Sequence, residues 1–164
     1  DALVRKLGGE RAVARRFGPL RFLLFMAVTA AAGAALHLAT HAGEDVPVIG
    51  ASAAISGTMA AAMRFAFQRG GPLSFNRSGE EKDYRVPAIP LVAVLRDPRV
   101  LAFVVVWFGI NILFGTSSLP LPGVGSDQVV AWQAHIGGFV AGLVLFSWFD
   151  PPPEPQIDNI APPA

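Results

Sequence analysis

Two side chains of this sequence, Ser52 and His135, could work together as a nucleophile and its base. A serine hydroxyl becomes an effective nucleophile when an imidazole within hydrogen-bonding distance takes its proton. Both side chains stand in apolar runs, and a histidine inside a membrane-spanning run is costly, so a functional role is the default for His135. Ser52 alone is weaker evidence, because hydroxyls in such runs often only bond a neighbouring backbone carbonyl.

The composition around these residues indicates a membrane protein. Of the 164 residues, 52% are hydrophobic and 15% are charged, whereas about a quarter of a soluble domain is charged. We expect an all-α fold, a polytopic bundle of four transmembrane helices within a domain of residues 1–149. The four apolar stretches that predict these helices are 20–40, 47–67, 100–115 and 128–149. The Pro-rich residues 150–164 are expected to be a disordered tail.

The positive charges predict how the four helices are oriented. All thirteen Lys and Arg residues fall within 5–21 and 64–99, and the connections on the other side of the membrane carry none. Because short cytoplasmic loops are rich in Lys and Arg, both basic segments are expected in the cytoplasm. Ser52 and His135 then lie at similar depths, near the extracytoplasmic face.

Small residues provide the faces on which the two helices could meet. His135 shares a helix face with Gly138 and Gly142, whose spacing is typical of membrane helices that pack closely. Ala53 and Gly57 have the same spacing on the helix that carries Ser52. Close packing of these faces would bring the hydroxyl and the imidazole within hydrogen-bonding distance.

No metal or cofactor is predicted. The sequence lacks cysteine, and its three histidines are too scattered for a zinc site, which needs several nitrogen or sulfur ligands. His37 and His41 are expected to face water or lipid headgroups. Asn111, an amide within the third stretch, is expected to make an interhelical hydrogen bond. The expected surroundings are a lipid bilayer, and no nucleic-acid partner is expected.

The residues around Ser52 and His135 resemble the rhomboid family of intramembrane serine proteases. The segment GASAAISG at 50–57 is similar to the Gly-x-Ser-Gly nucleophile motif of that family. The segment AHIGGFVAG at 134–142 is similar to its second motif, a histidine followed by close-packing glycines. The resemblance covers residues 1–149 and corresponds to the third through sixth helices of a six-helix core.

This resemblance implies a serine endopeptidase that cleaves transmembrane segments of other membrane proteins without a cofactor. Ser52 would be the nucleophile and His135 the general base, and the helix N-terminus at Gly50, Ala51 and Ser52 would supply an oxyanion donor. Gly57, Gly138 and Gly142 would be the close-packing glycines. The implied location is a bacterial inner membrane, with the active site near the extracytoplasmic face. The oxyanion His and Asn of the family lie on a helix that would precede Asp1, so the chain alone is expected to be inactive.

Two other interpretations remain open. A rhomboid-like protein without protease activity would bind transmembrane clients. Ala53, where the family motif has glycine, and Ser56, where many members have an aromatic residue, favour it slightly, whereas the presence of both Ser52 and His135 opposes it. Half of a transporter would have charged or broken helices in the middle of the membrane, and none of the four stretches has a charge there.

Overall fold

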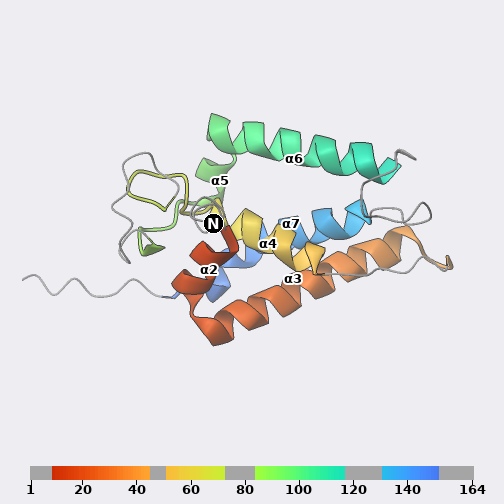
Figure 1. The fold of residues 1–164 in the computed structure, drawn as a ribbon, viewed down its shortest axis with the longest axis horizontal. Coiled ribbons are helices and arrows are strands. Elements are labelled where there is room, and N and C mark those ends of the chain that lie inside the picture. Colours follow the sequence, from red (N-terminus) through yellow and green to blue (C-terminus); the bar gives the residue numbers. More distant parts are fainter. Residues whose placement is uncertain (1–8, 45–50, 73–83, 117–130, 152–164) are drawn as a thin grey trace, which may run out of the picture.

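Helices make up the regular structure of this protein (Figure 1). The computed structural model describes residues 9–44, 51–72, 84–116 and 131–151. In chain order the helices are α2 (Gly9–Phe17), α3 (Pro19–Thr40), α4 (Ser52–Ala62), α5 (Leu91–Val94), α6 (Pro98–Thr116) and α7 (Trp132–Phe149). The described residues contain no strand, so the prediction of an all-α membrane bundle is confirmed.

Three of the described helices are long and apolar enough to cross a membrane. α3, α6 and α7 have 22, 19 and 18 residues. α4 has 11 residues, which gives a length of about 16 Å, whereas the hydrocarbon core of a bilayer is about 30 Å thick. The sequence predicts a fourth spanning helix over 47–67, but α4 ends at Ala62, and residues 63–67 form turns.

α4 is apolar because it is surrounded by protein. It packs against α2, α3 and α7, and Figure 1 shows α4 and α7 between α3 and α6. Eight of its eleven residues are buried, and all eight are Ala, Gly, Ser or Thr. A helix without a polar face is typical of a position covered on all sides. Burial in protein therefore explains an apolar stretch that the sequence alone assigns to lipid.

Glycines bring the backbones of α3, α4 and α7 close together. A Cβ on Gly138 of α7 would collide with the backbone of Ala53 in α4, and one on Gly142 would collide with the backbone of Gly57. On the other face of α4, a Cβ on Gly57 would lie 2.6 Å from the Thr29 side chain of α3. Only glycine fits at these contacts, which is the close packing that small residues allow in membranes.

α6 meets the rest of the bundle mainly through α7. Within α6 only Val100 and Asn111 are buried. Its exposed large side chains are Leu101, Val105, Val106, Ile110, Ile112 and Leu113. An apolar surface of this extent would be unfavourable in water, so it is suited to contact with lipid or with another apolar segment.

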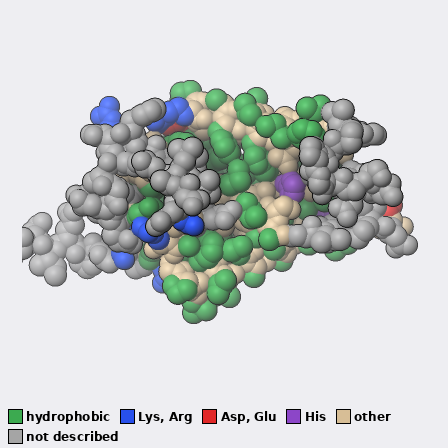
Figure 2. Space-filling model, in the orientation of Figure 1, with side chains coloured by type: hydrophobic (Ala, Val, Ile, Leu, Met, Phe, Trp, Pro, Cys, Tyr) green, Lys and Arg blue, Asp and Glu red, His purple; other side chains and the backbone are tan. Residues whose placement is uncertain are grey.

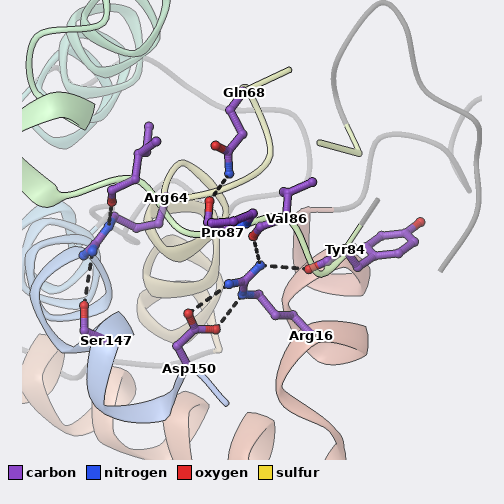
Figure 3. A network of polar contacts seen from close by, with 9 residues as sticks. Arg16, Arg64, Gln68, Tyr84, Val86, Pro87, Ser147 and Asp150 are labelled. Atoms are coloured by element: carbon purple, nitrogen blue, oxygen red, sulfur yellow. Dashed lines mark hydrogen bonds and ion pairs between the residues drawn. The ribbon is translucent and has the colours of Figure 1, made fainter. Parts of the chain in front are cut away.

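The described arginines gather at one end of the bundle (Figure 2). α3 and α6 begin at this end and run away from it, whereas α4 and α7 run back toward it (Figure 1). Arg64 at the arginine end is buried, and it donates hydrogen bonds to the Ile89 carbonyl and to Ser147 Oγ (Figure 3). It also donates to the Leu143 carbonyl of α7. Its guanidinium group therefore ties the turn after α4 to α7.

Arg16 makes a second, partly buried connection at the same end (Figure 3). It donates to the two carboxylate oxygens of Asp150, at 2.5 and 2.9 Å, and to the carbonyls of Tyr84 and Val86. The pair joins α2 to the residue that follows α7. The sequence places Asp150 in the predicted disordered tail, but this ion pair fixes it to the helices. Residues 152–164 of that tail lie outside the described residues.

Candidate active site

Ser52 and His135 belong to two packed helices, α4 and α7, that both run toward the arginine end of the bundle. Ser52 is the first residue of α4, and His135 is the fourth residue of α7. Ser52 Oγ lies 2.8 Å from His135 Nε2, and both side chains are half-buried. An imidazole can take a hydroxyl proton across this distance. The structure thus brings together the two side chains that the sequence pairs.

The backbone beside Ser52 is held by both neighbouring helices. The Ala53 carbonyl abuts Gly138 of α7, and the Ala53 methyl faces α3, where a Cβ on Gly33 would lie only 2.6 Å away. The methyl group that distinguishes Ala53 from glycine is thus accommodated by a glycine on α3. Ser56 donates its hydroxyl to the Ser52 carbonyl at 2.8 Å. The Ser56 hydroxyl is therefore satisfied within α4.

Asn111 of α6 is a third polar side chain at this site. Its Oδ1 lies 2.6 Å from His135 Nδ1, and its Nδ2 lies 2.8 Å from the Trp107 carbonyl. The sequence predicts an interhelical hydrogen bond for Asn111 but does not name its partner. A usable signal is depth, because Asn111 lies near the end of its stretch that faces the same side of the membrane as His135.

Aromatic packing flanks the hydrogen bond between α6 and α7. The ring centroids of Trp107 and Phe108 lie 4.7 and 5.7 Å from that of Phe139 in α7. One turn of α6 beyond Asn111, Gly115 makes room for Trp132, because a Cβ on Gly115 would collide with the indole ring. We call these contacts, together with the hydrogen bond, the α6–α7 seam. The seam fixes the part of α6 that faces His135.

The N-terminus of α4 is the candidate oxyanion site. Ala51 immediately precedes the helix and is exposed, whereas Gly50 lies outside the described residues. No side chain among the described residues caps this terminus. The first N–H groups of an α-helix have no partner within the helix, and they carry the positive end of its dipole. They are suited to binding a developing negative charge.

The other two histidines stack on each other at the end of α3, with ring centroids 4.3 Å apart. His37 is only 1% exposed, so the prediction that it faces water or headgroups is wrong. It lies one turn after Gly33, on the face of α3 that packs closely against α4 and α7. Among the residues that the structure describes, no group of three His, Asp or Glu side chains could hold a metal ion.

A known protein family matches most of this chain. The model of a family described as Rhomboid domain matches residues 9–150. That range contains every described helix and all three polar side chains of the site. No curated protein and no solved structure matches the chain.

Proposed function

This chain belongs to the rhomboid family, and from that premise we propose that it is an intramembrane serine endopeptidase acting through Ser52 and His135. The observation that carries the proposal is the 2.8 Å approach of Ser52 Oγ to His135 Nε2. Rhomboid proteins are usually proteases of this kind, although inactive members exist. An inactive member that only binds transmembrane clients has no need of a hydroxyl held against an imidazole, so this contact favours the protease.

The chemistry follows from the two side chains. His135 Nε2 takes the hydroxyl proton as Ser52 Oγ attacks the carbonyl carbon of the scissile peptide bond. The imidazolium then gives that proton to the leaving amine, and an acyl-enzyme ester forms on Ser52. In the second half of the reaction, His135 takes a proton from a water molecule as the water oxygen attacks the ester carbonyl. The imidazolium then gives this proton to Ser52 Oγ as the ester bond breaks.

The N-terminus of α4 supplies the electrostatic part of this proposal. Attack on the peptide carbonyl produces a negatively charged oxygen next to Ser52. The backbone N–H groups of Ala51 and Ser52 are the donors we assign to it, supported by the uncapped helix terminus. Preorganised donors of this kind typically contribute about 10²- to 10³-fold to the rate of acyl transfer.

The proposed substrates are transmembrane segments of other membrane proteins. The site lies in the part of the bundle away from the arginines, and by the positive-inside rule we assign this part to the extracytoplasmic side. Water, which hydrolysis requires, is available near that face. The exposed apolar side of α6 is the surface beside the site that a substrate segment arriving from the lipid would meet.

The test uses the full-length protein in detergent, with a model transmembrane substrate and a fluorophosphonate probe that labels activated serines. We expect the wild type to cleave the substrate and to be labelled by the probe. We expect Ser52→Ala and His135→Ala to show neither cleavage nor labelling. Ser56→Ala is the matched control, because it removes a hydroxyl from the same helix that hydrogen-bonds the Ser52 carbonyl and not the imidazole. A folded wild type that neither cleaves nor is labelled, or cleavage by Ser52→Ala at the wild-type rate, would refute the proposal. Client binding without cleavage would support the inactive alternative.

A further inference from the structure

We propose that Asn111 is a positioning residue that holds the proton of His135 on Nδ1, so that Nε2 stays free to act as a base toward Ser52. The consequence for catalysis rests on the proposed function. The position of the proton on His135 does not depend on the proposed function, and it can be measured separately.

The direction of each hydrogen bond follows from one fixed acceptor. The Trp107 carbonyl can only accept, so the Asn111 atom 2.8 Å from it is the Nδ2 donor, and Oδ1 faces His135. An amide oxygen can only accept as well, so His135 Nδ1, 2.6 Å away, must carry a proton. A neutral imidazole has a single N–H, which leaves the lone pair on Nε2. Ser52 must then donate its hydroxyl across the remaining 2.8 Å.

The opposite tautomer of His135 could not serve as the base. Either ring nitrogen of a neutral histidine can carry the proton, and the partner of one nitrogen decides the state of the other. With the proton on Nε2, the imidazole would donate to Ser52 Oγ and could not accept the hydroxyl proton. The Asn111 amide therefore selects the tautomer suited to catalysis before a substrate arrives.

The surroundings of Asn111 keep its amide in this orientation. Asn111 is 9% exposed, so water is poorly placed to replace a lost hydrogen bond. A flipped amide would set its oxygen against the Trp107 carbonyl, so the bond to that carbonyl would be lost whichever nitrogen of His135 carries the proton. The α6–α7 seam packs on both sides of the amide. An uncharged amide also orients the imidazole without the cost of placing a carboxylate inside a membrane.

The first test measures the proton directly. We would label the histidines of the full-length protein with ¹⁵N, record NMR spectra at a pH where the imidazole is neutral, and assign His135 from the signals lost in His135→Gln. We expect a protonated Nδ1 and an unprotonated Nε2 in the wild type, and a shift toward protonated Nε2 in Asn111→Leu. Thr116→Val is the matched control, since Thr116 also bonds a carbonyl of α6, that of Ile112 at 2.7 Å, but is exposed. A wild type with its proton on Nε2, or an unchanged tautomer in Asn111→Leu, would overturn the proposal.

The second test measures catalysis. We expect kcat of Asn111→Leu to fall about 10- to 100-fold with little change in KM. This range is the free-energy cost of a buried N–H group without its acceptor, converted into a rate. Asn111→Asp keeps an acceptor oxygen and should recover much of that rate, whereas Thr116→Val should match the wild type. Asn111→Ala is a second variant with a smaller side chain that also lacks the acceptor oxygen. Thermal unfolding of both variants shows whether each one is folded.

The two proposals fail in different ways. An active wild type whose folded Asn111→Leu and Asn111→Ala variants are equally active refutes the role of Asn111 and leaves the protease standing. A folded wild type without cleavage or labelling refutes the protease, and the NMR measurement still decides where the proton of His135 lies.

Discussion

Adding a single methyl group at Gly138 should separate Ser52 from His135. A Cβ at this position would collide with the Ala53 carbonyl and would lie only 3.0 Å from Ala53 Cα. Since carbon atoms prefer separations of about 3.5 to 4.0 Å, α4 and α7 would have to move apart by about 1 Å. Ala53 directly follows Ser52, so the 2.8 Å contact between Oγ and Nε2 would open by a similar amount. That leaves a distance beyond the roughly 3.2 Å limit for direct proton transfer.

The expected result for Gly138→Ala is a loss of activity of about 100-fold, the usual consequence of misplacing a catalytic group by about 1 Å. Overpacking should also reduce the free energy of unfolding by about 1 to 3 kcal/mol. Both quantities can be measured on the full-length protein, by cleavage of a model substrate and by unfolding in detergent. Gly109→Ala is the matched control, because a Cβ there meets no atom within 4 Å. Wild-type activity in Gly138→Ala would show that the glycine contact does not position Ser52.

Further predictions concern stability. Asp150→Asn should reduce the free energy of unfolding by about 3 kcal/mol, because it leaves the buried Arg16 guanidinium without its counter-charge. Asp97→Asn, which breaks a pair with an Arg99 side chain that is 59% exposed, should change the unfolding midpoint little, and equal losses in the two variants would contradict this assignment. Phe139→Ala should destabilise the fold by about 3 to 5 kcal/mol by emptying the aromatic part of the α6–α7 seam. A stability close to wild type would show that the seam contributes little.

The pairing of Ser52 with His135 could be predicted because two independent signals agree on it. The distribution of Lys and Arg places both side chains at one depth, and the spacing of Gly138 and Gly142 marks the face of α7 on which a partner helix can approach closely. Neither signal needs a side-chain conformation. Both depend only on the order of residues along the helices.

The length of α4 could not be predicted in the same way. An apolar sequence indicates that a helix is shielded from water, but it does not distinguish burial in lipid from burial in protein. Ala60 and Ala61 look like residues of a membrane span, yet both are fully covered by neighbouring helices. The same limit applies to His37, because an otherwise apolar helix gives no sign of which of its faces turns inward.

The contacts of Asn111 and Asp150 could not be predicted for a different reason. The bond from Asn111 to His135 depends on the rotation of α6 about its own axis, and the apolar side chains on every side of α6 leave that rotation open. The pair of Arg16 and Asp150 joins residues 134 positions apart in the chain. Only the packed helices bring these groups together.

The glycine contacts restrict how this sequence can change over time. At Gly138 and Gly142 the opposing atoms belong to the main chain of α4, which every amino acid shares. A larger residue at either position therefore cannot be compensated by a smaller side chain opposite, as it can in a core of interlocking side chains. Substitutions should accumulate instead on the exposed face of α6, where Val105 and Leu113 can be exchanged for other apolar residues without disturbing a neighbour. Tolerance to mutation in this protein should consequently differ more between helix faces than between helices.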